Sequence, residues 1–303
     1  PKSMALRKAT STTDGDLLLL VNDTDGSLVT YSILRGQNVI APSLNTTDGT
    51  FEGVAVDVDQ IYVVVKRTID GATKYYVEVL NDDNTTDSAT LLSGSTLPNA
   101  STITKTVTVA GGKFVIDTVS QDTLTLYEGH TYKFDQSDSS NSGHPLRFST
   151  TSDGTHNSGS EYTTGVTTNG TPGSSGAYTQ IVVASGAPTL YYYCTNHSGM
   201  GGQANTPVGA EITGLSHLEG KTLKIIIDDS MHSDVAVSSG KLVVTTLPTS
   251  YIELGLNYTP TVKTLPVELK LPSGNIMAQR KRIVEATANL YLSQNLTLNG
   301  NDF

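Results

Sequence analysis

The sequence has no tryptophan, one cysteine and only five phenylalanines in 303 residues. A single cysteine excludes a framework of disulfides within the chain. Apolar residues make up 37% of the chain, so a hydrophobic core can form, but it must be built from Val, Ile, Leu and Tyr. β-branched and tyrosine side chains favour pleated, half-buried strands, and the abundant Gly, Asn and Asp favour turns. We therefore predict an all-β fold of short antiparallel strands, for which propeller blades and a barrel stay open as arrangements.

Long hydrophobic runs and a basic surface are also missing. The longest wholly apolar runs, such as Leu17–Val21, have five residues, whereas a transmembrane helix needs about 20. The formal net charge is −10, and the densest basic cluster is Gln279–Arg282. Proteins that bind nucleic acid carry larger clustered basic faces. Because this cluster has only four residues in an acidic chain, we interpret it as a solvated strand end. An acidic chain of this kind is expected either not to adhere to nucleic acid or to let it slide past.

Helical patterns are nearly absent, and only Met277–Leu290 hints at a helix. In residues 1–98, apolar runs alternate with turn signals, and this pattern predicts hairpins. One joins strands Asp16–Val21 and Leu28–Ile33 through a turn with an Asp-Gly pair, and another joins Ile61–Arg67 to Lys74–Leu80. An Asp-Gly pair between apolar runs is a strong hairpin signal. The chain begins at Pro1, without an initiator methionine, and we expect it to be an internal stretch of a longer polypeptide.

The composition divides the chain into three parts. A polar stretch with few apolar anchors, 81–101, separates the first hairpins from a second β block at 113–202, and a linker is predicted at 203–209. The predicted boundaries are 1–104 for the first half of a scaffold, 105–210 for an inserted domain, and 211–303 for the second half. After the linker we predict strands at Leu223–Ile227, Lys241–Thr246, Tyr251–Leu256 and Val262–Leu265.

Four residues in the middle block form a set of potential metal ligands: His144, Cys194, His197 and Met200. A thiolate, two imidazoles and a weak axial thioether are the ligands of type 1 copper sites. The last three share one short loop with C-x2-H-x2-M spacing, and a β-sandwich could bring His144 beside it. A sandwich without metal stays open as the alternative, so copper is a candidate cofactor and not a required one.

The other histidines are not predicted as ligands. His130 and His156 lie among polar turn residues and are expected to be solvated. His217 and His232 lie outside the middle block and are expected to be structural or exposed.

The middle block resembles the cupredoxins, the family of plastocyanin, pseudoazurin and amicyanin, over residues 113–202. The resemblance lies in the opening strand, the Glu-Gly-His-Thr-Tyr-Lys-Phe hairpin, the His144 segment and the ligand loop: Phe114–Asp117, Glu128–Phe134, Ser142–Phe148 and Tyr191–Met200. It implies a β-sandwich in which His144, Cys194, His197 and Met200 hold the metal.

The flanks resemble a different family, the tail tubular protein B or tail nozzle proteins of short-tailed bacteriophages. The similarity spans most of 4–98 and 211–298, in ordered phrases at Asp25–Tyr31, Gln37–Ser43, Thr47–Val54, Val64–Gly71, Tyr76–Leu80, Thr213–Thr222, Gly255–Tyr258 and Lys263–Pro266. That family does not contain the cupredoxin-like block, so the block is predicted to be an insertion displayed outward.

The nozzle resemblance implies a virion structural protein that assembles in the cytoplasm of the bacterial host. It would form a homohexameric ring at the distal end of the tail and contact the tail adaptor, the tail fibres and the host surface. DNA would pass through its channel during genome ejection without specific binding. A copper redox or electron-transfer protein is the alternative function. An enzyme is not expected, because we find no catalytic motif in its usual local context.

Overall fold

The computed structural model describes residues 1–10, 14–81 and 83–263, together with 270–271, 274–275, 287, 297–298 and 300–302. The chain divides into two compact units, Pro1–Tyr258 and Thr259–Phe303. The fold is all-β, as predicted, and the helices of the described residues are 3-10 turns of three or four residues. No helix in that part of the chain has the length and apolar character needed to span a membrane.

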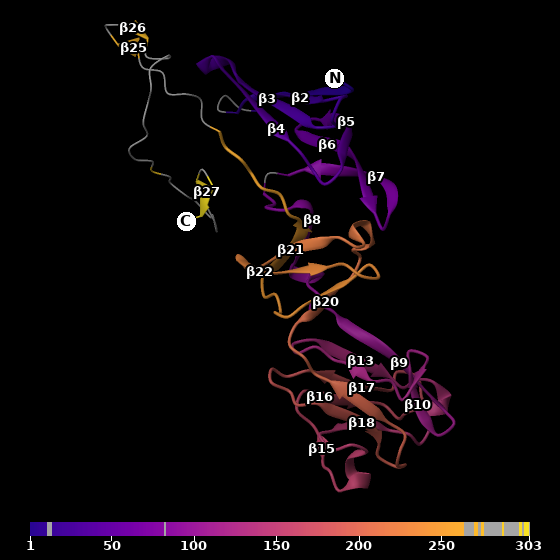
Figure 1. Ribbon diagram of the computed structural model, residues 1–303. Coiled ribbons are helices and arrows are strands. Elements are labelled where there is room, and N and C mark those ends of the chain that lie inside the picture. The colour runs from indigo at the N-terminus through magenta and orange to yellow at the C-terminus, as the bar shows by residue number, and fades with distance from the viewer. Residues whose placement is uncertain are drawn as a thin grey trace. The chain divides into compact units, whose positions relative to one another are not determined.

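Two antiparallel sheets build the first core (Figure 1). One has the order β1-β2-β3-β4, with strands at Ser3–Arg7, Asp16–Val21, Leu28–Leu34 and Val39–Asn45. The other has the order β5-β6-β7, with strands at Thr50–Asp57, Gln60–Ile69 and Ala72–Leu80. The inward side chains of both sheets share one buried cluster: Leu19, Val21, Leu28, Phe51, Ile61, Val63 and Val65.

Both predicted hairpins are present. β2 pairs with β3 along its whole length, with Leu20 opposite Val29. β6 ends at Ile69 and β7 begins at Ala72, so two residues form the turn. Asp70 and Gly71 both have positive φ, 50° and 70°, which is the conformation that a two-residue turn of type I′ requires.

A second core is formed by segments from both sides of the middle block. A sheet of order β22-β21-β24-β8 and a separate pair, β20-β23, enclose it. The strands are β8 (Asp87–Ser93), β20 (Ala210–Ile212), β21 (Thr222–Ile227), β22 (Ser230–Ala236), β23 (Leu242–Val244) and β24 (Tyr251–Leu256). β8 lies in the polar stretch 81–101, for which no strand was predicted. Its partner strand is β24, far along the chain.

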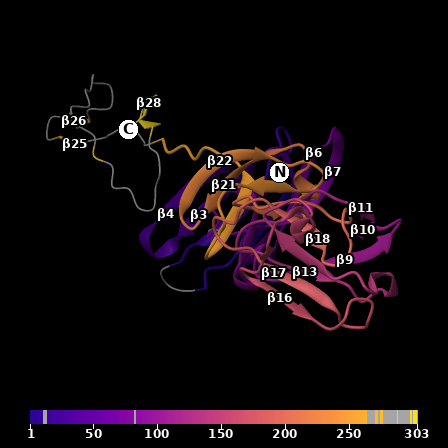
Figure 2. The ribbon, with the colours of Figure 1, turned by 90° about the horizontal axis from the view of Figure 1, so that it is seen from below.

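The middle block is a β-sandwich. Its six-stranded sheet has the order β11-β10-β9-β13-β17-β16, and its five-stranded sheet has the order β12-β19-β18-β14-β15. Figures 1 and 2 show β9, β13, β17 and β16 side by side in the first sheet. The strands are β9 (Thr102–Ala110), β10 (Lys113–Ile116), β11 (Val119–Ser120), β12 (Leu124–Thr125), β13 (Thr131–Asp135), β14 (Leu146–Ser149), β15 (Glu161–Tyr162), β16 (Val166–Asn169), β17 (Tyr178–Val182), β18 (Leu190–Cys194) and β19 (Gly202–Asn205).

The core of the sandwich contains aromatic and aliphatic side chains from both sheets, including Phe114, Phe134, Phe148 and Tyr192. The Phe134 and Phe148 rings meet edge to face at a centroid distance of 5.4 Å. Aromatic pairs in this geometry add stability beyond their buried area. Of the five phenylalanines of the chain, three lie in the core of the sandwich and one, Phe51, lies in the first core.

The remaining strand predictions had mixed outcomes. β24 has the predicted bounds, and β21 contains the predicted Leu223–Ile227. The predicted linker at 203–209 is partly strand, because β19 runs to Asn205. Val262 is not in a strand. The helix hint at 277–290, apart from position 287, and the basic cluster at 279–282 lie outside the described residues. Among the residues after Tyr258 that the structure does describe, there are four two-residue strands: Lys270–Leu271, Gly274–Asn275, Thr297–Leu298 and Asn301–Asp302.

Candidate metal centre

The pairing of β14 with β18 brings the predicted ligands together. Leu146 lies opposite Cys194 in this antiparallel pair, and the Thr195 backbone N–H donates to the carbonyl of Pro145 at 3.1 Å. His144 comes just before β14, and Cys194 is the last residue of β18. The register therefore places the His144 turn beside the loop that follows Cys194.

Three of the four predicted residues form a compact cluster. Cys194 Sγ lies 3.9 Å from His144 Nδ1 and 3.7 Å from His197 Nδ1. The centroids of the two imidazole rings lie 4.7 Å apart, and the ring planes form an angle of 46°. One ligand atom from each residue can be chosen so that all three lie within 4.8 Å of one another.

These distances fit ligation of one ion. Metal–sulfur bonds of about 2.3 Å and metal–nitrogen bonds of about 2.0–2.1 Å, separated by an angle of about 120°, place sulfur and nitrogen about 3.8 Å apart. The two observed sulfur–nitrogen distances lie on either side of this value. One thiolate and two imidazoles are also the trigonal donor set of blue-copper sites. Cys194, His144 and His197 would hold a copper ion here, and copper would supply a one-electron redox couple.

The cluster lies between the core and the surface. Cys194 is buried, His144 is half-buried and His197 is exposed. Burial, together with the neighbouring His197, lowers the pKa of His144, which favours the neutral imidazole that binds metals. Met200 is 2% exposed and belongs to the same core cluster as Cys194. The fourth predicted residue is thus a buried thioether on the ligand loop.

Polar contacts hold the ligand loop in place. The Asn196 side-chain amide donates to the Gly143 carbonyl at 2.9 Å, and so links the Cys194 loop to the turn that carries His144. His156 Nε2 donates to the Cys194 carbonyl at 2.9 Å. Asp153 Oδ1 accepts from the Gly199 backbone N–H at 2.8 Å. Such outer contacts orient the ligands of metal sites.

Sequence reasoning missed these supporting residues. Asn196 could have been suspected from its position between two candidate ligands. His156 and Asp153 give no such signal, because they lie about 40 residues before the loop in a polar segment. His156 is exposed, as expected, but its ring is fixed by the bond to the Cys194 carbonyl.

The prediction for His130 is wrong. We expected a solvated side chain, but His130 is 2% exposed. It precedes β13, and its ring lies between Tyr127 and Tyr132 at centroid distances of 5.8 and 6.2 Å. Burial lowers its pKa, although a contact with the Glu128 carbonyl opposes the effect. Like His217 and His232, it lies outside the cluster of potential ligands in the described residues.

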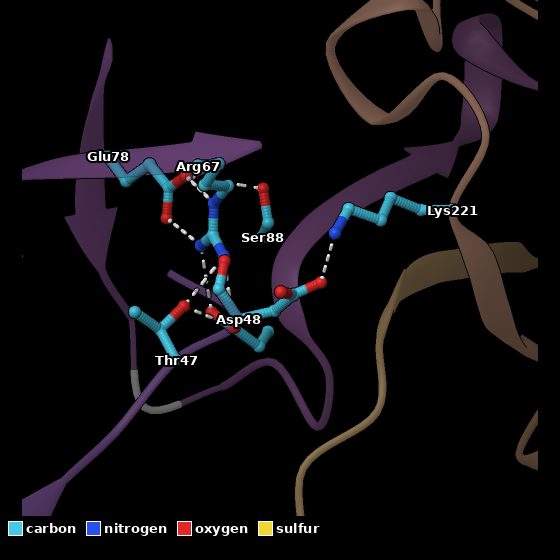
Figure 3. A network of polar contacts seen from close by, with 7 residues as sticks. Thr47, Asp48, Arg67, Glu78, Ser88 and Lys221 are labelled. Atoms are coloured by element: carbon cyan, nitrogen blue, oxygen red, sulfur yellow. Dashed lines mark hydrogen bonds and ion pairs between the residues drawn. The ribbon is translucent and has the colours of Figure 1, made fainter. Parts of the chain in front are cut away.

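A second polar cluster surrounds Arg67 in β6, whose side chain is 1% exposed (Figure 3). Its Nε and Nη2 donate to the two carboxylate oxygens of Glu78 at 2.9 and 2.8 Å. Nη1 donates to Thr47 Oγ1 at 2.7 Å and to the Asp48 carbonyl at 2.9 Å. Asp87 Oδ1 lies 3.3 Å from Nη2. Because Asp87 begins β8, this cluster joins the first core to the second.

The Asp48 carboxylate extends the connection. It forms an ion pair with Lys221 at 2.6 Å, as Figure 3 shows. Lys221 immediately precedes β21 of the second core. The guanidinium of Arg67 is satisfied on every side by its protein partners, so we interpret this cluster as a structural junction.

Comparison with known proteins adds no assignment, because no family model and no curated protein matches the chain.

Proposed function

We propose that the chain is a structural subunit of a phage tail nozzle, with the cupredoxin-like sandwich displayed from its scaffold. The ordered phrases in the two flanks support this reading. One structural observation supports the single scaffold with an inserted sandwich: β8 and β24 pair with each other, although the whole sandwich lies between them in the sequence. The two flanks therefore form one scaffold.

The points where the chain leaves and re-enters the scaffold support an insertion. Leu97, before the sandwich, and Ala210, after it, belong to the same buried cluster. A domain is tolerated as an insertion when its own ends lie close together. The sandwich can then project from the scaffold and contact a fibre or a host surface, while the scaffold contacts its copies and the tail adaptor.

The acidic balance suits a channel for DNA. With a net charge of −10, an assembled ring repels phosphate, and DNA can pass through without being held. In the virion, the ring would form the distal channel for genome ejection.

Electron microscopy of the purified chain, or of the particle that contains it, tests the proposal. We expect a closed ring of six copies, each with a projecting β-sandwich. A protein that stays monomeric at every concentration, with no ring in the particle, would contradict it.

A second function is favoured by the Cys194 cluster: we propose that the sandwich binds copper through Cys194, His144 and His197. Its support is the pair of sulfur–nitrogen distances that one ion would span. Addition of Cu(II) should produce the intense thiolate-to-copper absorption of type 1 sites, with one copper per chain by elemental analysis. Cys194→Ser should abolish both, whereas His217→Gln, outside the cluster, should change neither. A wild-type chain that stays colourless and retains no copper would exclude this function.

A further inference from the structure

Apolar side chains dominate the outer face of the β1–β4 sheet, and Asp16 lies at one end of it. Alternate side chains of a strand point to opposite faces of the sheet, and Leu19, Val21 and Leu28 point into the first core. The opposite face is formed by ten apolar residues, none of which is buried: Met4, Leu6, Leu18, Leu20, Val29, Tyr31, Ile33, Ile40, Pro42 and Leu44. We refer to these ten residues as the β1–β4 outer face.

The register aligns these side chains in rows across all four strands. Met4 pairs with Leu20, which pairs with Val29, which in turn pairs with Leu44. At the edges of the sheet Met4 is 63% exposed and Leu44 is 64% exposed. A face of this kind would normally carry polar side chains in an antiparallel sheet with one face in water.

Charged side chains lie at the ends of this face, and Lys2, two residues before Met4, forms an ion pair with Glu52. Asp16 has the same strand parity and pairs with Ile33 in the register. Its carboxylate forms ion pairs with Lys8 and Arg35 at 3.3 and 3.2 Å. An apolar patch with a polar rim is typical of interaction surfaces.

The outer face of the β5–β7 sheet is also largely apolar. Its apolar members are Ala55, Tyr62, Val64, Tyr75, Val77 and Val79, which lie opposite the core-facing Ile61, Val63 and Val65, and Lys66 lies on the same face as the cross-strand partner of Tyr75. Val77 is 74% exposed and Tyr75 is 62% exposed. We refer to this set as the β5–β7 outer face. Since both sheets pack on the same core, both outer faces point away from that core, and one copy can present both at once.

We propose that the β1–β4 outer face of one copy packs against the β5–β7 outer face of the next copy. This inference rests on the proposed ring and names the surfaces that build it. Contacts between unlike faces are heterologous, and they form a ring when the rotation between copies closes. Pairing of like faces in a twofold dimer would leave one apolar face of every copy in water.

The areas favour a closed assembly over an isolated pair. Strand spacing of about 4.8 Å and a rise of about 3.3 Å per residue give each face about 400 Å². One junction then buries about 800 Å² in total, less than the roughly 1,200–2,000 Å² of stable complexes. In an isolated pair each copy buries about 400 Å², whereas in a ring each copy uses both faces and buries about 800 Å². The second value equals the area that one partner usually buries in a stable complex. We therefore expect rings without stable dimers.

Lysine substitutions on each face test the pairing. Ile40→Lys/Leu44→Lys changes the β1–β4 outer face, and Tyr75→Lys/Val77→Lys changes the β5–β7 outer face. All four side chains are more than 60% exposed, so the core is left intact. Met231→Lys, at a 50% exposed position of β22, is the matched control. Added lysines reduce the net charge of −10, so general repulsion between copies cannot explain a loss of assembly.

Sedimentation velocity and native mass spectrometry of the full chain give the readout. We expect wild type and Met231→Lys to form the closed ring, and each double variant to be monomeric. An equimolar mixture of the two double variants keeps one intact pair of faces, so it should form 1:1 heterodimers at high concentration. That rescue also shows that both variants are folded.

Other outcomes overturn the inference in distinguishable ways. If both double variants keep the wild-type ring, these faces are not the interface, although the proposed function stands. If one double variant forms homodimers on its own, like faces pair. If the wild-type chain is itself monomeric, the proposed function fails together with the inference.

Discussion

Removal of the Arg67 guanidinium should loosen the junction between the first and second cores. Arg67 is 1% exposed, and its partners Glu78 and Asp87 are 20% and 22% exposed. Loss of one partner from a buried ion pair costs 3–5 kcal/mol. Because both carboxylates keep some contact with water, we expect the lower end, about 3 kcal/mol, for Arg67→Met.

Two further variants calibrate this value. Arg67→Lys keeps the charge but has three donors in place of five, so it cannot maintain the paired bonds to Glu78 together with those to Thr47 and Asp48. We expect it to cost about 1–2 kcal/mol. Lys241→Met breaks the exposed pair with Glu211 and should cost less than about 1 kcal/mol.

Native-state hydrogen exchange is the appropriate assay, because a chain with three cores need not unfold in one step. A loss of about 3 kcal/mol corresponds to exchange about 150-fold faster for β6 and β7 amides that exchange by opening of the first core. Amides of β13 in the sandwich should be unaffected. Acceleration below about 5-fold in β6, or an equal change in β13, would refute the reasoning.

Three other changes have expected outcomes of their own. Glu253 is 4% exposed, and its Oε1 accepts bonds from the backbone and hydroxyl groups of Thr85 and Thr86 at 2.7–3.2 Å; Glu253→Ala should cost about 2–3 kcal/mol, seen as faster exchange of β8 amides. Asn196→Ala removes the link to the Gly143 carbonyl and should weaken copper binding about 10–100-fold in a competition titration, and an unchanged affinity would show that the link does not orient the ligands. Hydrogen bonds from Thr249 and the Tyr251 backbone lower the pKa of Asp228, so its stabilisation is complete above the unfolded-state value of about 4 and is lost as the pH falls below it. Asp228→Asn should therefore be less stable at neutral pH and show a flatter loss of stability below about pH 4, measured by thermal unfolding across pH.

The sequence predicted those features that depend on neighbouring residues or on residue type. The Asp70–Gly71 turn follows from local backbone preferences, and β24 follows from a short apolar strand between turn signals. The convergence of His144, Cys194 and His197 was expected because only the combined set suits one metal. Their order along the chain matched a sandwich, and the pairing of β14 with β18 supplies the contact.

Long-range partners could not be predicted in the same way. β8 looks like a polar connection until β24 is known to pair with it. The burial of His130 depends on tyrosines packed around it, and the Arg67 cluster depends on Thr47, Glu78 and Asp87 meeting from separate strands. No local pattern distinguishes these residues from solvated ones, because their burial is decided by tertiary packing.

The pairing of β8 with β24 has a consequence for the order of events as the chain is synthesised. β8 emerges about 160 residues before β24, and closing so long a loop costs conformational entropy. If the roughly 100 residues of the sandwich fold first, the flexible part of the loop shrinks to about 60 residues, and the closure cost falls by about 1 kcal/mol. Until β24 is made, β8 leaves an unpaired edge open to other chains. Early folding of the sandwich would shorten the search that ends this exposure, so a fast-folding insertion offsets most of the closure cost that it adds to the scaffold.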